Sequence, residues 1–222
     1  MNMQANVTII IPTLNEAGNI GITIEKIKKI LPNDKIIVTD DGSTDQTQSI
    51  AKASRATVID RSAAQVKGIT AAVIDAAQKV MTKYMVVMDA DLQHPPEKVK
   101  EILKKLRKND IVIGVRKSIV GNWGFFRKMQ SKIATSLAHL RLGKRIRDPM
   151  SGFFGIRTEI FRNVKKSNVD RRCFKILFNL LKNCDKKKTK ISYVFYKFDM
   201  RKNGKSKIGM KHVWYFLRNV VK

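Results

Sequence analysis

The chain has 222 residues, 43% of them hydrophobic, which is enough for one domain with a substantial core. Its formal charge is +27, and residues 165–222 contribute 18 basic against 3 acidic side chains, a net of +15. This charge favours anionic partners, namely nucleic acid, lipid headgroups or phosphorylated substrates, and argues against a neutral surface without such partners.

Cysteine content and hydropathy exclude several further classes. Cys173 and Cys184 are the only cysteines and lack metal-ligand spacing, so we expect reduced intracellular thiols; a disulfide between them is the less favoured alternative. Residues 1–4 run directly into a strand pattern, which leaves no room for a signal peptide. No apolar run approaches the roughly 20 residues of a spanning helix. If the protein works at a membrane, we expect it to lie on the surface or to be held there by a partner.

Short apolar runs alternate with helical patterns along the first half of the chain. Gly42 permits a tight turn, after which Ser43 or Thr44 is expected to cap a helix. This alternation predicts an α/β fold with a mixed, mainly parallel sheet and helices on both faces. The predicted strands are 7–11, 35–39, 56–59, 84–88 and 111–115, and the predicted helices are 19–31, the segment ending near 53, 68–81 and 95–108.

Three polar loops follow predicted strands, at residues 12–16, 40–42 and 89–93. The carboxyl ends of parallel strands share one edge of the sheet, where ligands bind in open α/β folds. We therefore expect a nucleotide site at this edge. No Gly-x-Gly-x-x-Gly follows the first strand and no Gly-Lys-Ser/Thr phosphate loop occurs, so the phosphates are expected to meet a metal and cationic side chains.

The third of these loops carries Asp89 and Asp91 directly after a buried strand. Two carboxylates at this position can hold Mg²⁺ or Mn²⁺, whose other ligands are phosphate oxygens and water. Pro95 and Pro96 then suit the start of a helix. For an isolated Asp-x-Asp, the alternative is a pair of solvated acids that cap the strand.

A different pattern begins after residue 115. Amphipathic helices with aromatic residues near Trp123 are predicted up to about residue 140. Arg127 and Ser131 are four residues apart, which places them on one helix face where they can share an anion. The alternative is a cationic solvent face over an apolar stripe.

The last part of the chain is strongly basic. After the loop 148–153 and a strand, we predict a basic helix at 171–182 and a strand at 191–198. A cationic loop follows at 201–207 and suits a clamp over phosphate. Aromatic and basic residues at 213–218 suit a lipid headgroup interface.

In their joint order, the motifs resemble those of the inverting family 2 glycosyltransferases of the GT-A fold. The resemblance is strongest to the branch that makes polyprenyl-phosphate sugars such as dolichol-phosphate mannose. The motifs are Ile-Pro-Thr-Leu-Asn15-Glu16, Asp40-Asp41-Gly-Ser, Asp89-Ala-Asp91-Leu-Gln93-His94-Pro-Pro-Glu, Asp148-x-x-Ser-Gly-Phe and Arg201-x-x-Gly-x-Ser-Lys207.

The resemblance assigns roles to individual residues. It implies a GT-A catalytic domain over residues 1–165 that binds the nucleotide sugar and includes the interface helices, and a basic part of the same domain over 166–222. It implies a nucleotide site of Pro12, Leu14, Asn15, Glu16, Asp40 and Asp89, and Mg²⁺ or Mn²⁺ on Asp89, Asp91 and Gln93. It implies an acceptor-phosphate site of Arg116, Arg127, Ser131, Arg201 and Lys207, with Asp91, Arg116, Arg127, Asp148 and Arg201 as the catalytic set.

The implied reaction is inverting transfer of a hexose, with mannose from GDP-mannose favoured, to a polyprenyl or dolichyl phosphate. The implied location is peripheral, at the cytoplasmic face of an anionic membrane, with a membrane partner subunit as an open possibility. A lipid phosphate is already an anion and needs little or no general base. Asp148 is therefore open to two interpretations, a base or sugar-orienting carboxylate and a turn residue.

Three alternatives remain open at this point. One is a UDP-glucose-dependent transferase with the same acceptor class, and another is a transferase acting on a carbohydrate hydroxyl, which needs Asp148 as a true base. The third is a basic nucleic-acid-binding module, for which no recognised motif is present. We therefore expect no nucleic-acid partner. Departures from the family pattern, such as Asn179 where a glutamate is expected, concern the acceptor side.

Overall fold

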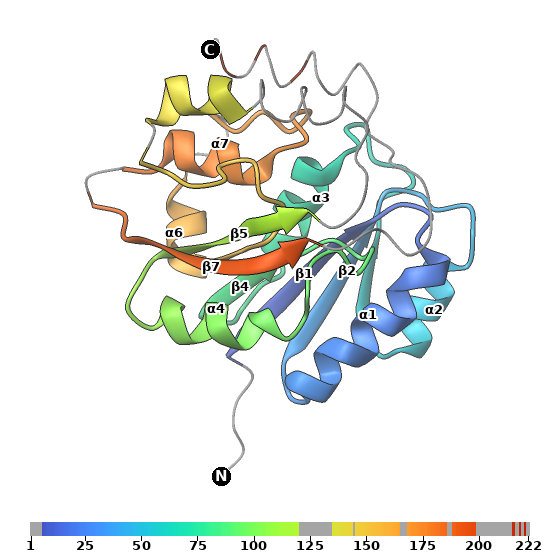
Figure 1. Ribbon diagram of the computed structural model, residues 1–222. Coiled ribbons are helices and arrows are strands. Elements are labelled where there is room, and N and C mark those ends of the chain that lie inside the picture. Colours follow the sequence, from blue (N-terminus) through green and yellow to red (C-terminus); the bar gives the residue numbers. More distant parts are fainter. Residues whose placement is uncertain are drawn as a thin grey trace.

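A computed structural model describes residues 6–119, 135–143, 145–164, 168–185, 188–198 and the single positions 215, 218 and 220. Strands and helices alternate through the first half, as predicted (Figure 1). The helices are α1 (Ala17–Ile30), α2 (Thr47–Ala53), α3 (Ile69–Ala77), α4 (Lys98–Leu106), α6 (Thr158–Asn163) and α7 (Ile176–Asn183), and residues 135–142 are also helical. The strands are β1 (Val7–Thr13), β2 (Lys35–Asp40), β3 (Thr57–Asp60), β4 (Tyr84–Val87), β5 (Ile111–Ile119), β6 (Phe154–Arg157) and β7 (Ile191–Phe198).

The strands form one seven-stranded sheet in the order β3-β2-β1-β4-β6-β5-β7. The first four are mutually parallel, β6 runs antiparallel to both of its neighbours, and β7 is parallel to β5. The carboxyl ends of β1, β2, β4, β5 and β7 therefore lie at the same edge. The arrowheads of β5 and β7 point the same way, side by side, in Figure 1. The prediction of a mixed, mainly parallel sheet is confirmed.

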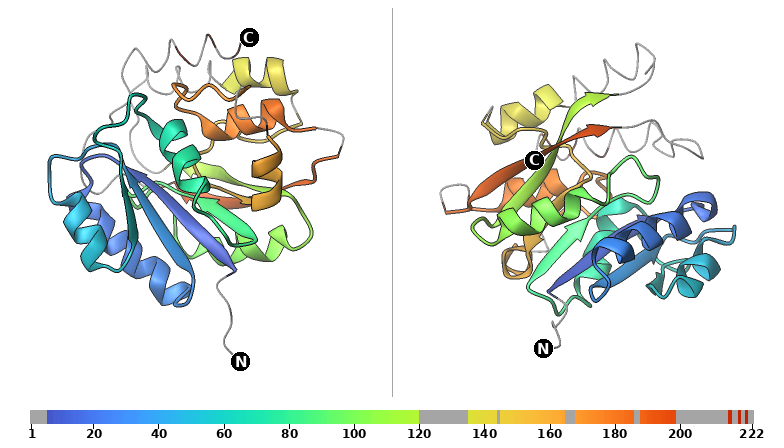
Figure 2. Two further views of the ribbon diagram at one scale, coloured as in Figure 1. Left: turned by 180° about the vertical axis from the view of Figure 1, so that it is seen from behind. Right: turned by 60° about the horizontal axis from the view of Figure 1, so that its bottom comes forward.

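Helices cover both faces of the sheet, and each covered face has its own core. Along β1, Val7, Ile9 and Ile11 point into the core beneath α1, α2 and α4, whereas Ile10 points into the core beneath α3, α6 and α7. This alternation is the two-residue period of a strand buried on both sides. Seen from behind, α3, α6 and α7 lie in front of the sheet (Figure 2, left).

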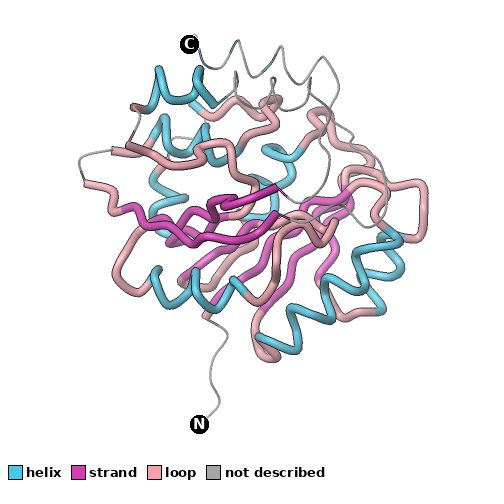
Figure 3. The backbone as a smooth tube through the Cα atoms, viewed as in Figure 1, coloured by secondary structure: helices cyan, strands magenta, loops and turns pink. Residues whose placement is uncertain are grey.

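Several element boundaries differ from the prediction at the site edge. β1 continues through Pro12 to Thr13, because the segment still pairs with β2. α2 begins only at Thr47, and neither Ser43 nor Thr44 caps it. The Ser43 hydroxyl instead donates to Asp40 at the end of β2, and the Thr44 hydroxyl donates to Asn15 in the loop after β1, so the capping prediction is wrong. Because α2 begins late, the loop after β2 is longer than predicted, and it is drawn among the loops of Figure 3.

The predicted basic helix at 171–182 is also corrected. Residues 171–175 are not helical, and α7 buries every residue from Ile176 to Leu181. The basic side chains of this segment lie mainly in the preceding loop. The prediction followed the basic composition of the segment, but the helix forms over the apolar run 176–181, which packs into the core.

Among the described residues, no helix is both long and apolar enough to span a bilayer. The part of the predicted interface helices around Trp123 lies outside the described residues, as do the predicted loop 201–207 and most of 213–218.

Candidate functional site

Asp40 ends β2 and organises the loop behind it. Its carboxylate is fully buried and accepts five hydrogen bonds. The donors are the backbone N–H groups of Gly42 (3.1 Å) and Ser43 (2.7 Å), the hydroxyls of Thr13 (3.1 Å) and Ser43 (2.5 Å), and the Gln48 amide (2.9 Å). Gly42 has φ 91°, a conformation that glycine adopts without steric cost. Asp40 therefore sets the shape of the edge where the nucleoside is predicted.

The loop after β1 is tied to the same turn. The Asn15 N–H donates to Ser43 Oγ at 2.7 Å, and its side-chain oxygen accepts the Thr44 N–H at 2.8 Å. The Glu16 N–H donates to Thr47 Oγ1 at 2.7 Å. The β1 and β2 loops thus form one unit. Of the residues assigned to the nucleoside, Glu16 and Asp40 are buried, Asn15 is exposed, and Pro12, Leu14 and Asp89 are intermediate or partly exposed.

The predicted metal loop follows β4. Asp91 is 2% exposed and its Oδ1 accepts the Gln93 N–H at 3.1 Å, whereas the Asp89 carboxylate is 37% exposed. On the opposite side, Thr23 of α1 donates to the Ala90 carbonyl at 2.7 Å. The loop is therefore held in place before any ligand arrives.

The donor chemistry of this loop fits a hard divalent cation. Asp89 and Asp91 offer carboxylate oxygens and Gln93 offers an amide oxygen. Within the described residues, no three His, Cys, Asp or Glu side chains gather into a metal-binding group. Such a partial set suits Mg²⁺ or Mn²⁺ that takes its remaining ligands from substrate phosphates and water.

His94 closes this loop. Its Nδ1 accepts the Asp89 N–H at 3.0 Å, and the ring is 3% exposed. Burial lowers the pKa of His94 to about 4, against the partly opposing effect of Asp91. The imidazole is therefore uncharged at neutral pH.

The metal loop after β4 forms one wall of the site. Arg116, near the end of β5, and Asp148, in the loop before β6, form a second wall. Arg116 Nε lies 2.9 Å from Asp148 Oδ2, and a terminal guanidinium nitrogen lies 2.8 Å from Oδ1. Both side chains are largely buried, at 19% and 10% exposure. The pairing is bidentate, so each oxygen of Asp148 already accepts from Arg116.

Lys175 is a site residue that the sequence reasoning missed. It directly precedes α7, and its Nζ donates to the Met150 carbonyl at 3.0 Å. Burial and the charge of Arg116 lower the pKa of Lys175, while Asp89 and Asp148 oppose them. Lys175 therefore adds a cation beside the loop that carries Asp148 and Met150. The only feature of the sequence that could have indicated Lys175 is its position directly before the apolar start of a helix.

Arg61, also missed, fixes the loop between β3 and α3. The guanidinium pairs with Asp41 and, at 2.9 Å, with Asp75, and donates to the Val66 carbonyl at 2.6 Å. Arg171 also pairs with Asp75, at 2.7 Å. Because Arg61 is 4% exposed, Asp41 depends on this buried cation for charge compensation, whereas Asp75 is shared with Arg171.

Arg61→Met is expected to lower the free energy of unfolding by about 3 kcal/mol, since it leaves Asp41 without its buried cation and Asp75 with Arg171 alone. Urea denaturation measures this. Arg162→Met is the matched control, because Arg162 donates to the Val80 carbonyl at 2.7 Å and bonds no carboxylate among the described contacts. Equal losses in the two variants would contradict the role given to the ion cluster.

Four residues that were predicted to bind the acceptor phosphate lie outside the described residues, namely Arg127, Ser131, Arg201 and Lys207. The structure brings Asp89, Asp91 and Gln93 to the edge of the sheet predicted for the polar loops, and Arg116 and Asp148 lie at the same edge.

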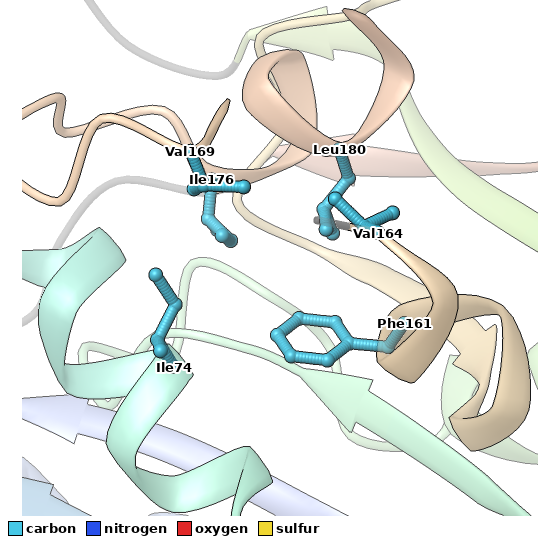
Figure 4. A pocket seen from close by; sticks show the side chains of 6 residues that line it. All are labelled: Ile74, Phe161, Val164, Val169, Ile176 and Leu180. Atoms are coloured by element: carbon cyan, nitrogen blue, oxygen red, sulfur yellow. The ribbon is translucent and has the colours of Figure 1, made fainter. Parts of the chain in front are cut away.

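Two hollows lie away from this edge. One is an apolar gap of about 10 Å³ between α3, α6 and α7, where the six labelled side chains face one another (Figure 4). It is about the size of a single water and has no polar partners, so it is a packing defect of the core. The other, of about 610 Å³, is lined by residues that include Leu142, Leu181 and Tyr193, none of which is a predicted site residue.

Comparison with known sequences identifies relatives over most of the chain. Residues 8–165 match the family described as Glycosyl transferase family 2. Dolichol-phosphate mannosyltransferase of Pyrococcus furiosus is 36% identical, over 96% of this chain and 62% of the relative, so this chain spans less than two thirds of that protein. The Saccharomyces cerevisiae dolichol-phosphate mannosyltransferase is 28% identical over 98% of this chain and 86% of the relative. Polyprenol monophosphomannose synthase of Mycolicibacterium smegmatis is 32% identical over 76% and 68%.

Solved structures share the fold. Glucosyl-3-phosphoglycerate synthase from Mycobacterium tuberculosis, crystallised with Mn²⁺, UDP and glucosyl-3-phosphoglycerate, superposes with a TM-score of 0.68 at 21% identity, covering 98% of this chain and 77% of that one. At this identity the likeness establishes the architecture alone.

Proposed function

The chain belongs to glycosyl transferase family 2, and on that premise we propose that it transfers a hexose from a nucleotide sugar to a polyprenyl or dolichyl phosphate, with inversion at the anomeric carbon. Mannose is the favoured sugar and GDP-mannose the favoured donor, because relatives over most of the chain are named as mannosyltransferases of dolichol phosphate or as a polyprenol monophosphomannose synthase. UDP-glucose is the alternative donor.

The observation that carries the acceptor class is the Arg116–Asp148 pair. A hydroxyl acceptor must lose its proton to a base, whereas a phosphate acceptor is already an anion. Both oxygens of Asp148 are bonded to Arg116, so Asp148 is poorly placed to take a proton. This arrangement supports an acceptor that needs positioning and charge compensation more than deprotonation.

Arg116 then serves as a positioning cation. Its guanidinium also lies 5.6 Å from the Phe198 ring centroid, so an aromatic face and a carboxylate fix its plane. A fixed guanidinium can direct its remaining N–H groups at phosphate oxygens. We propose Arg127, Ser131, Arg201 and Lys207 as further acceptor contacts.

Asp89, Asp91 and Gln93 would hold Mg²⁺ or Mn²⁺. When bound, the metal supplies electrostatic stabilisation of the charge that develops on the leaving diphosphate. The chain's own contribution is the fixed loop geometry given by Thr23 and His94. The loops of β1 and β2 form the nucleoside edge in this proposal, with Pro12, Leu14, Asn15, Glu16 and Asp40.

We place the reaction at the cytoplasmic face of a membrane, with the protein as a peripheral component. The formal charge of +27 supports attraction to anionic lipid, and the acceptor itself is a membrane lipid. A membrane partner subunit is compatible with this location. The basic surface serves lipid in this proposal, and no nucleic-acid partner is proposed.

Lys175→Met is expected to weaken substrate binding about tenfold or more, because it removes a charged donor beside Asp148 and keeps most of the unbranched side chain. Lys28→Met is the matched control, since Lys28 likewise bonds backbone carbonyls, at Ser54 (2.6 Å) and Arg55 (3.2 Å). KM values for donor and acceptor show which phosphate Lys175 contacts. Unchanged KM values with a lowered Tm would mean that Lys175 only anchors the Met150 carbonyl.

Calorimetric titration tests the donor assignment. GDP-mannose and UDP-glucose are titrated separately into the protein with Mn²⁺, and again with a chelator. The proposal predicts tighter binding of GDP-mannose and loss of binding without metal. Tighter binding of UDP-glucose would favour the alternative donor.

A further inference from the structure

The ring of His94 lies where three parts of the site meet. On one side its Nδ1 accepts the backbone N–H of Asp89 at 3.0 Å. On the others it stacks on Phe153, with ring centroids 5.2 Å apart, and meets Tyr196 and Phe198 of β7 at 6.0 and 5.9 Å. His94 therefore joins the metal loop to the segment before β6 and to β7.

Gly152 shows how closely this junction is packed. A Cβ placed on Gly152 would lie 3.2 Å from His94 Cε1 and 3.3 Å from Asp89 Oδ2. The same loop carries Asp148, which holds Arg116. Gly152 thus packs against both His94 and the predicted metal ligand Asp89.

Two roles are compatible with a buried aromatic ring here. A packing role uses only the shape of the ring, and phenylalanine would fill it as well. The hydrogen bond adds a requirement that packing does not have, since it needs an acceptor at the Nδ1 position. With Nδ1 as acceptor, the ring proton resides on Nε2.

We propose that His94 is a positioning residue for nucleotide–metal binding, which orients Asp89 by accepting its backbone N–H. This inference rests on the proposed function only in assuming that the Asp89 loop binds a nucleotide diphosphate through a divalent metal. Groups that orient metal ligands typically change metal affinity 10- to 100-fold when removed.

The test compares substitutions that separate the acceptor from the ring. Asparagine places an oxygen near the Nδ1 position, glutamine places one nearer Nε2, and phenylalanine keeps the ring without an acceptor. GDP with Mn²⁺ is titrated into wild-type protein and the His94→Asn, His94→Gln and His94→Phe variants, with the Tm of each recorded. His139→Phe is the matched control, because His139 is a partly buried histidine that bonds the Ile146 carbonyl at 3.0 Å.

We expect His94→Phe and His94→Gln to weaken Mn²⁺-dependent GDP binding about 10- to 100-fold, and His94→Asn and His139→Phe to lose less than about 10-fold. If His94→Phe fails to fold, the difference in GDP affinity between His94→Asn and His94→Gln still tests the inference. Wild-type affinity in His94→Phe, or equal losses in the asparagine and glutamine variants, would overturn the inference. Absence of Mn²⁺-dependent GDP and UDP binding by the wild type would instead overturn the nucleotide site itself.

Discussion

Asp91→Asn is expected to reduce sugar transfer about 100-fold or more, with little change in stability. Asp91 is buried in the metal loop, and its Oδ1 accepts the Gln93 N–H. Asparagine can still accept that bond, so the loop should keep its shape. It lacks the negative charge that would hold the metal against the diphosphate. Initial rates of transfer and Mn²⁺-dependent nucleotide affinity measure the effect.

Asp110→Asn is the matched control for this change. Asp110 is also a largely buried aspartate, pairs with Arg157 and accepts the Lys190 N–H at 2.8 Å, but it precedes β5 at the opposite edge of the sheet. It should affect the free energy of unfolding and leave transfer unchanged. Near-normal transfer by Asp91→Asn would remove the metal loop from the reaction.

Arg116→Lys is expected to lower kcat/KM for the acceptor about 100-fold, because lysine cannot form the bidentate pair with Asp148 or present a planar fork to phosphate. Asp148→Asn should lower it less, through a loosened Arg116. Asp148 has φ 44°, and asparagine tolerates this left-handed conformation, so the backbone should survive.

The double variant distinguishes positioning from base catalysis. If Asp148 acts only through Arg116, the Arg116→Lys, Asp148→Asn protein should be no worse than Arg116→Lys alone. Steady-state kinetics of the four proteins give this comparison. Additive losses, with kcat falling in Asp148→Asn at unchanged KM, would indicate an independent role for Asp148 as a base and would favour a hydroxyl acceptor.

The strands and their polar ends were predictable from local pattern. Residues 84–88 are a short apolar run followed by Asp89 and Asp91, and a strand buried on both faces needs little more than such a run to be recognised. The alternation of strands and helices then placed the polar loops at one edge. β7 at Ile191–Phe198 was predicted with the same bounds.

Features that depend on distant contacts were not predictable in the same way. Ser43 has the composition of a helix cap, but its hydroxyl bonds Asp40 and accepts the Asn15 N–H. Arg61 and Lys175 look like surface cations in the sequence, and only the fold brings Arg61 to Asp41 and Asp75 and Lys175 to the Met150 carbonyl. The bidentate pairing of Asp148 with Arg116 joins residues 32 positions apart and could not be predicted from local pattern.

The most direct test of the account is transfer to a defined acceptor. Purified protein with Mn²⁺ or Mg²⁺ is given radiolabelled GDP-mannose and a short polyprenyl phosphate, with the unphosphorylated polyprenol in a parallel reaction. We predict that label enters the lipid phase with polyprenyl phosphate as acceptor and not with polyprenol. The product should be acid-labile and inverted at the anomeric carbon. Transfer to the free alcohol, or no transfer to the phosphate from either GDP-mannose or UDP-glucose by protein that binds the nucleotide, would contradict it.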